Sequence, residues 1–282
     1  SICIKVSVFA LLERVYLGLH QPRDYNVGHA DSNPKGGFMA MWRRQPPQAQ
    51  WLPQLRQWSS GENGRRLIAA EMEAIGRSCA DEAYAFRQCL LSPLDLDVEP
   101  ALPAPAQPVR LGSPLQQHYQ SNLDALSTFD ALPVATDTQD LVLVQHVLEF
   151  ADNPHLVLRE VERIVAPRGR LIVCCFNPVS FMGLRIAMGR MRGRPLWQQH
   201  FLQLNRLKDW LALLGFETDS VQYFCHRPGW IARQSENGND AFPGLRIKPE
   251  WKERCPLGAS YVLTAVKPRA AIRPQKPRWS RD

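Results

Sequence analysis

Apolar blocks separated by an amphipathic stretch predict a strand, a helix and a second strand between residues 140 and 181. Residues 141–144 form a continuous apolar run, which is typical of a parallel strand covered by helices on both faces. In residues 154–165, apolar side chains recur on one face and charged side chains occupy the other. Residues 171–176 form a second apolar run. We therefore expect one βαβ unit here and an α/β fold for the domain.

Local signals mark the ends of these elements. Asn153 can cap the helix with Pro154 at its first position, where proline sacrifices no hydrogen bond. Residues 166–169 contain proline and glycine, and we expect them to form a turn that ends the helix. Polar residues follow each strand, in 145–150 and in 177–181. Since ligands bind beyond the carboxyl ends of strands in open α/β sheets, these two segments are the expected site.

Five short motifs of this region occur in a characteristic order: Asp130-Ala131-Leu132-Pro133, Asp140-Leu141-Val142, His146-Val147-Leu148-Glu149, Leu158-Arg159-Glu160 and Pro167-Arg168-Gly169. In order and spacing they resemble the second half of class I S-adenosylmethionine-dependent methyltransferases. Residues 176–185 resemble more narrowly an uncharacterised proteobacterial branch of that superfamily. The resemblance implies a Rossmann-like fold, with a mostly parallel seven-stranded sheet, an antiparallel edge hairpin and helices on both faces. It also implies S-adenosylmethionine as cofactor and a methyl acceptor, which we expect to be a small molecule.

The first half of the predicted sheet departs from the family pattern. Its first strand is expected within residues 83–91, and class I methyltransferases usually follow that strand with a glycine-rich turn, because glycine lets the backbone approach the cofactor closely. This chain has no glycine between Gly76 and Gly112. The glycine-rich motif is therefore degenerate, and a catalytically silent binding or regulatory protein is the alternative to an enzyme.

The resemblance implies a set of cofactor-binding residues. In the family, an acidic residue matching Asp130 accepts a hydrogen bond from the adenine amino group, and a carboxylate suits that donor. The alternative for Asp130 is a turn aspartate that caps its own backbone before Pro133. The full expected set is Ser92, Asp130, Ala131, Leu132, Gln145 and His146.

Two further groups of residues are candidates for contact with the substrate. His146 and Glu149 follow the central strand, and a histidine there can orient a substrate or take a proton, although a structural role is equally open. Asn177, Ser180 and Arg185 are the expected substrate-binding residues; Asn177 and Ser180 can equally cap the following helix. Methyl transfer needs little acid–base help, because the sulfonium is an activated leaving group. The catalytic base therefore stays unassigned.

Other patterns predict the remaining elements. Residues 61–80 form an amphipathic helix, which in this superfamily commonly flanks the cofactor site. The other expected elements are helices at 114–126, 182–193 and 204–215 and strands at 109–111, 216–224 and 260–266, the last two forming the edge hairpin around a long loop. The helix at 182–193 carries methionines and arginines and lies where a substrate lid would lie; the alternative is a helix that packs its apolar side on the sheet and leaves its charges in solvent.

Charge and cysteine usage narrow the function further. The net charge is +7, but the last sixteen residues, 267–282, hold six basic residues and one acidic residue. We interpret them as an extended basic tail rich in proline; RNA binding through this tail is a further alternative, and nucleic-acid binding is not expected elsewhere.

The seven cysteines form no C-x-x-C pair and no metal-ligand spacing, so no metal site is predicted and a cytoplasmic location is expected. Cys174 and Cys175 are expected to be core residues.

The start of the chain is expected to be dispensable. Residues 1–38 contain an apolar stretch that Lys5, Glu13 and Arg14 interrupt, which suits neither a transmembrane span nor a signal peptide. Met39 or Met41 can be the true start, and the alternative is a short amphipathic helix packed on the domain. The expected organisation is an extension at 1–38, a methyltransferase-like domain at 39–266 and the tail at 267–282.

Overall fold

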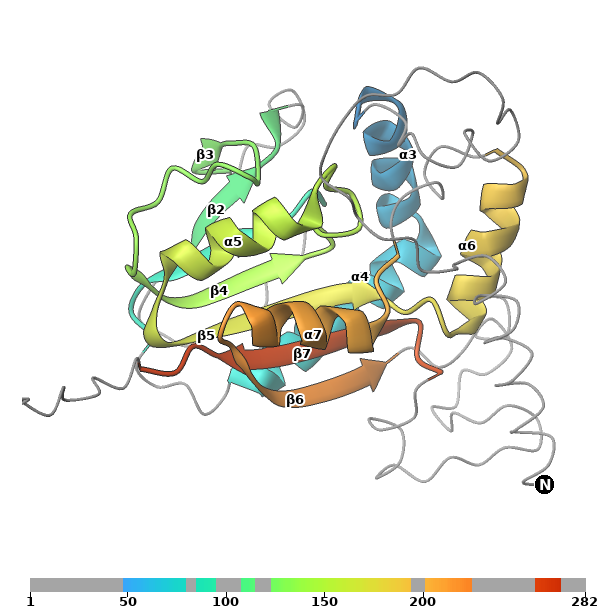
Figure 1. Ribbon diagram of the computed structural model, residues 1–282. Helices are drawn as coiled ribbons and strands as arrows, with labels where there is room; N and C mark the ends of the chain where they lie inside the picture. The colour runs from blue at the N-terminus through green and yellow to red at the C-terminus, as the bar shows by residue number, and fades with distance from the viewer. Residues whose placement is uncertain are drawn as a thin grey trace, which may run out of the picture.

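The structure is a computed structural model that describes residues 48–79, 85–94, 108–114, 123–193, 201–224 and 257–269. Within these ranges, seven strands form one sheet in the order β3-β2-β1-β4-β5-β7-β6 (Figure 1). The strands are β1 (Gln88–Leu91), β2 (Val109–Gly112), β3 (Ala125–Leu126), β4 (Gln139–Gln145), β5 (Val165–Phe176), β6 (Glu217–Phe224) and β7 (Ser260–Val266). The helices are α3 (Gln48–Ser60), α4 (Glu62–Cys79), α5 (Pro154–Ile164), α6 (Phe181–Met191) and α7 (Leu204–Leu213).

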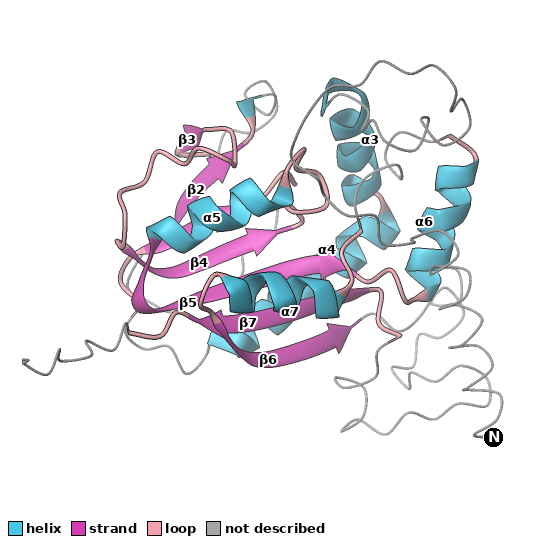
Figure 2. Ribbon diagram, in the orientation of Figure 1, coloured by secondary structure: helices cyan, strands magenta, loops and turns pink. Residues whose placement is uncertain are grey.

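Strand direction confirms the predicted fold class. Strands β1 to β5 pair in parallel, and β7 lies antiparallel between β5 and β6 (Figure 2). The sheet order reverses at β1, because the chain moves from β1 outward to β2 and β3 and then returns to place β4 on the other side of β1. In an open α/β sheet such a switch point lies at the boundary between neighbouring strands whose connections run in opposite directions, here β1 and β4.

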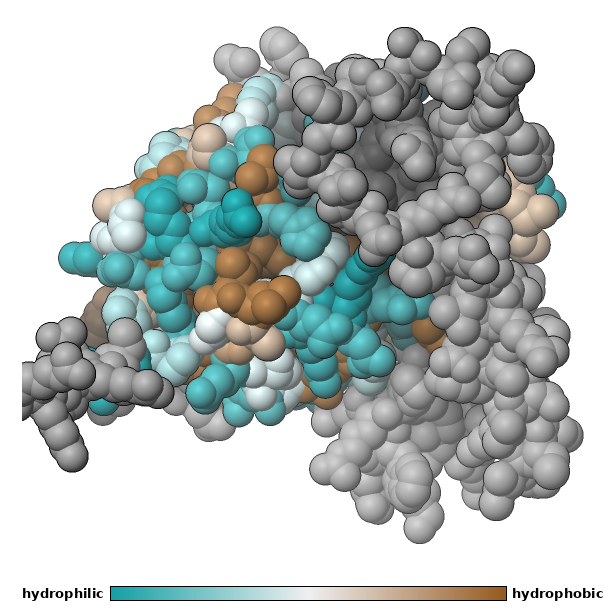
Figure 3. Space-filling view, in the orientation of Figure 1, coloured by the Kyte–Doolittle hydropathy of each residue, from teal (hydrophilic) through white to brown (hydrophobic). Residues whose placement is uncertain are grey.

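Helices cover both faces of the sheet. α5 and α7 lie on the near face in Figure 1, while α4 lies behind the sheet and packs with α3. Strand residues alternate between the two cores: Cys174 faces the core that contains α4, and its neighbour Cys175 faces the core that contains α5 and α7. Hydrophilic residues cover much of this face in Figure 3, together with an apolar area in its middle. Leu156 of α5 and Leu213 of α7 are exposed hydrophobic side chains.

The βαβ unit forms largely as its sequence predicts. Asn153 caps α5, with its side-chain oxygen accepting from the N–H groups of His155 and Leu156. The expected turn at 166–169 is different in detail, because β5 begins immediately after the helix and these residues are part of the strand. Arg168 there has a φ of 70°, so the strand is bent at the position where the turn was expected.

Two elements differ from the sequence-based expectations. The helix predicted for 114–126 is wrong at its end, where β3 pairs in parallel with β2 through Leu111 and Ala125. α3 has no counterpart among the predicted elements, and it carries Pro53 in its interior, which ordinarily argues against a helix. It is held by tertiary packing, since Trp51 and Leu55 are buried in the core beside α4.

Several predicted segments lie outside the described residues. These are the extension at 1–38, the segments 95–107 and 225–256, and the tail from residue 270 onward. Lys267, the first residue of the predicted tail, still packs on the domain, because its Nζ lies 2.9 Å from Asp137 Oδ1 and 2.9 Å from Glu162 Oε1. Among the described helices none is both long enough and apolar enough to span a bilayer.

Candidate functional site

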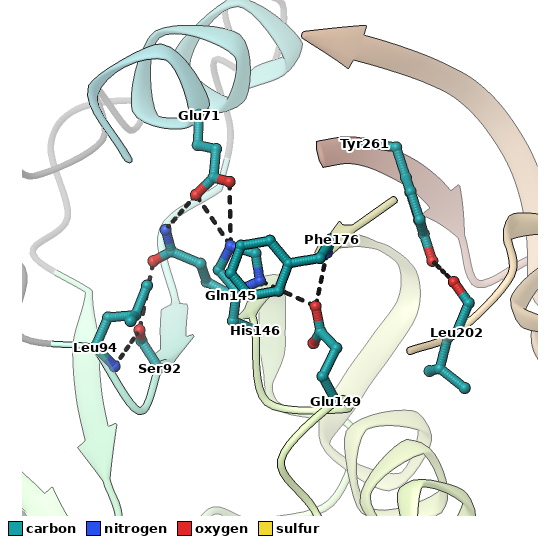
Figure 4. Close-up of polar contacts among 9 residues, drawn as sticks. All are labelled: Glu71, Ser92, Leu94, Gln145, His146, Glu149, Phe176, Leu202 and Tyr261. Atoms are coloured by element: carbon teal, nitrogen blue, oxygen red, sulfur yellow. Dashed lines mark hydrogen bonds and ion pairs between the residues drawn. The ribbon is translucent and has the colours of Figure 1, made fainter. Parts of the chain in front are cut away.

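The two strands beside the switch point bring two predicted residues together. Leu91 of β1 pairs with Val144 of β4, so the residues that follow them, Ser92 and Gln145, emerge side by side. Ser92 Oγ donates to Gln145 Oε1 at 3.4 Å and accepts from the backbone N–H of Leu94 at 3.1 Å (Figure 4). Both side chains are buried. A polar bridge therefore joins the carboxyl ends of β1 and β4, at the point where α/β folds bind their ligands.

Helix α4 adds a carboxylate to this bridge. Glu71 Oε2 accepts from Gln145 Nε2 at 3.2 Å, and both carboxylate oxygens lie 3.1 Å from His146 Nε2. Glu71 is completely buried. The sequence carried a signal for this residue that was overlooked, since Glu71 lies one helical turn from Leu67 and from Ile75 and thus occupies the apolar stripe of its helix.

The opposite side of the His146 ring meets a second buried carboxylate. His146 Nδ1 lies 3.0 Å from Glu149 Oε1, and the same oxygen accepts from the backbone N–H of Phe176 at 2.7 Å. The imidazole stacks on the Phe176 ring with 4.0 Å between centroids. His146 has a φ of 51°, an uncommon conformation that directs the chain from the end of β4 into this position. Each ring nitrogen of His146 is thereby paired with a carboxylate.

Glu71, Gln145, His146 and Glu149 form a buried cluster. Within it, burial and the neighbouring charges have opposite effects on the pKa of His146. Burial alone lowers the pKa of His146, but the charges and hydrogen bonds of Glu71 and Glu149 outweigh that effect and raise the pKa to about 10. The histidine is therefore an imidazolium at neutral pH, with both N–H groups donating. Glu149 Oε2 is buried and has no hydrogen-bond partner among the described residues. Burial, with the same carboxylates, holds the pKa of the Cys174 thiol well above its usual value.

The structure gives the predicted substrate residues local roles. Ser180 Oγ accepts from Gly183 N–H at 2.9 Å and donates to Asn177 O at 2.7 Å, which is the capping alternative. Asn177 Nδ2 donates to Gly258 O at 2.8 Å, and its Oδ1 accepts from Val179 N–H at 3.0 Å. Arg185 is exposed on α6. Contact of these three residues with a substrate stays a prediction.

The predicted adenine-binding residues lie apart from the buried cluster. Asp130 and Ala131 are exposed in the loop after β3. Leu132 is buried, and its N–H donates to Glu160 Oε2 of α5 at 3.1 Å. Ser92 contacts Gln145 directly, and Glu71 links Gln145 to His146. The Asp130 segment reaches the same edge of the sheet separately. Cofactor binding by each of these residues stays a prediction.

Comparison with known proteins shows that part of this chain matches a protein family. Residues 113–173, from the end of β2 into β5, match a family described as a methyltransferase domain. The resemblance to class I S-adenosylmethionine-dependent methyltransferases is confirmed. The class I methyltransferase fold also accounts for the sheet order and for the antiparallel β7.

Individual proteins are similar to parts of this chain. The uncharacterised protein YafS of Escherichia coli is 40% identical over 114 residues, which are 40% of this chain and 47% of that protein. A malonyl-(acyl-carrier protein) O-methyltransferase of Alcanivorax borkumensis is 34% identical over 79 residues, 28% of this chain and 25% of that protein. The chain thus spans less than half the length of either relative. A solved S-adenosylmethionine-dependent methyltransferase from Archaeoglobus fulgidus has a TM-score of 0.48 at 15% identity, covering 72% of this chain and 94% of that one.

Proposed function

We propose that this chain binds S-adenosylmethionine at the switch point between β1 and β4 and transfers its methyl group to a small-molecule acceptor. The observation that carries the proposal is the polar bridge from Ser92 to Gln145, which lies directly beyond the carboxyl ends of these two neighbouring strands. The family match over residues 113–173 supports the same reaction class.

The residues present fit the cofactor in two places. Its methionine end carries an ammonium and a sulfonium, and the Gln145 amide oxygen and the Ser92 hydroxyl are acceptors suited to positive charge. Its adenine end carries an amino donor, and the exposed Asp130 carboxylate after β3 suits that group. Beyond β1 the chain offers Ser92 in place of a glycine turn, so cofactor contact there relies on side chains.

The chain's own residues would contribute position and electrostatics. S-adenosylmethionine supplies the activated methyl group on a positively charged sulfur. Glu71 and Glu149 flank His146 near the carboxyl end of β4, and these two buried carboxylates fix the ring in place and keep it charged. Both nitrogens of His146 face carboxylates, which leaves no lone pair for a general base while the ring is an imidazolium. We therefore assign His146 a positioning role.

Calorimetry on the purified full chain tests the proposal. We expect S-adenosylmethionine and S-adenosylhomocysteine to bind, and we expect Gln145→Ala to weaken both by at least about tenfold, the loss expected for one hydrogen bond to a charged group. Gln139→Ala is the matched control, because Gln139 lies at the opposite end of the same strand. Binding of neither ligand at millimolar concentration would exclude the enzyme.

A second pair of variants tests the adenine contact separately. Asp130→Ala should weaken binding of S-adenosylhomocysteine, whereas Asp209→Ala removes an exposed carboxylate on α7 and should not. Equal affinity of Asp130→Ala and the parent protein would refute the assignment of Asp130 while leaving the rest of the proposed site intact.

One observation favours the catalytically silent alternative. The oxygen of the Gln145 side-chain amide accepts from Ser92, and its nitrogen donates to Glu71. The sequence also has no glycine between Gly76 and Gly112 that would let the backbone approach a cofactor closely. A silent protein would keep these contacts as structure. The same calorimetry distinguishes the two functions, because only the enzyme requires the cofactor to bind.

A further inference from the structure

A third kind of side chain reaches the buried cluster from β5. Cys174 follows Val173 on the strand beside β4 and faces the same core as α4. Its thiol, the Glu71 carboxylate and the His146 imidazole form a group whose ligand atoms all lie within 4.8 Å of one another. All three residues are 0% exposed. They come from a helix, a loop and a strand that lie far apart in the sequence.

We propose that Glu71 Oε1, His146 Nε2 and Cys174 Sγ form a binding site for Zn²⁺. Thiolate, imidazole and carboxylate are the three ligand types that zinc takes in proteins, and this mixture of sulfur, nitrogen and oxygen suits a borderline-soft ion. Magnesium and calcium prefer sites made of oxygen alone. Three protein ligands leave the fourth tetrahedral position open.

The surroundings of the cluster hold its ligands as zinc sites require. A metal-binding histidine usually donates its second ring N–H to a carboxylate, and His146 Nδ1 lies 3.0 Å from Glu149 Oε1. That oxygen also accepts from the backbone N–H of Phe176. The ligating carboxylate is held too, because Gln145 Nε2 donates to Glu71 Oε2 and leaves Oε1 for the ion. Both ligands therefore have outer partners that fix their orientation.

The spacing of the ring and the carboxylate also suits an ion between them. His146 Nε2 lies 3.1 Å from Glu71 Oε1, close to the separation of about 3.3 Å that two ligands about 2.0 Å from a tetrahedral zinc would have. In the absence of metal a proton occupies this position. Zinc binding replaces the proton on Nε2 and the proton on the Cys174 thiol, so two protons leave for each ion bound.

This inference goes beyond the proposed function, and its test uses no S-adenosylmethionine. Protein freed of metal by a chelator is titrated with Co²⁺, which substitutes for zinc and reports thiolate ligation by a charge-transfer band in the near ultraviolet. We expect one Co²⁺ per chain with that band, tetrahedral visible bands, and displacement of both by Zn²⁺.

Two neighbouring cysteines supply the decisive comparison. Cys174→Ser should abolish the charge-transfer band, whereas Cys175→Ser should keep it, because Cys175 is equally buried but faces the core of α5 and α7. Glu149→Gln should weaken binding about 10-fold to 100-fold while keeping the band, as expected for an outer partner of a ligating histidine. Thermal unfolding of each metal-free variant shows whether it is folded.

X-ray absorption of the zinc-loaded parent protein gives a result that needs no variant. One sulfur and a remainder of nitrogen and oxygen around the ion are expected. A shell without sulfur would overturn the site, as would loss of the cobalt band in Cys175→Ser but not in Cys174→Ser. Absence of any cobalt or zinc binding by the folded parent protein would overturn it equally, and would leave the proposed methyl transfer untouched.

Discussion

α4 and α5 cover opposite faces of one sheet and bury different kinds of side chain. α5 buries Pro154, Val157, Leu158, Val161 and Ile164, which are all apolar. α4 buries a similar apolar stripe but places Glu71 in its middle. A buried carboxylate without partners is costly, so it persists only where other groups satisfy it. The core under α5 is therefore apolar at the helix, whereas the core under α4 also contains a buried charge from its helix.

The largest expected effect on stability comes from removing the Glu71 charge, which is the feature that distinguishes α4 from α5. Glu71→Gln leaves the His146 imidazolium with one carboxylate instead of two, and removing one partner of a buried charge pair costs about 3–5 kcal/mol. Urea denaturation with a chelator present, so that no metal contributes, measures the loss. Glu73→Gln is the control, since Glu73 is exposed on the same helix and should behave as the parent protein. Equal stability of the two variants would contradict a structural charge cluster.

A second substitution tests whether the α5 face serves packing alone. Leu158 is buried on α5, and Leu158→Ala should lower the free energy of unfolding by about 2–5 kcal/mol, because a cavity replaces packed atoms. The affinity of the folded variant for S-adenosylhomocysteine should stay that of the parent. A loss of affinity comparable to that of Gln145→Ala would show that the two faces are not separate in function.

The smallest expected effect concerns the local signal that begins α5. Asn153→Ala removes the side-chain acceptor for two backbone N–H groups and should cost about 1 kcal/mol of stability. Asn205→Ala is its control, because Asn205 is exposed in the first turn of α7, whose N-cap residue makes no side-chain cap bond. If Asn153→Ala unfolds at the same temperature as the parent protein and the control, α5 is positioned by packing rather than by its cap.

Elements with strong local patterns could be predicted. The predicted helix at 61–80 corresponds to α4, and the apolar runs at 141–144 and 171–176 lie in β4 and β5. The hairpin of β6 and β7 was likewise predicted from alternation and is confirmed. α3 and β3 were not, because the proline of α3 contradicts its local propensity and β3 is only two residues long.

The candidate site was predicted only on the residues that follow a strand. Gln145, His146 and Glu149 were expected at this edge of the sheet, since the carboxyl ends of parallel strands converge there, and Ser92 was implied by the methyltransferase resemblance. The partner of His146 was missed, because Glu71 lies 75 residues earlier in the chain on a helix that was interpreted only by its apolar positions. Cys174 was expected to be core, and it is, but its neighbours in that core were not foreseeable.

The sequence by itself determined the α/β class, because periodicity and caps are local properties of the chain, and its motifs implied the class I methyltransferase fold by resemblance. Only the tertiary structure decided the chemistry of the cluster. Hydrogen bonds and charge interactions act over a few ångströms in space, whatever the separation in sequence. Folding brings Glu71, His146 and Cys174 within that range, and burial then turns three ordinary side chains into a coupled group.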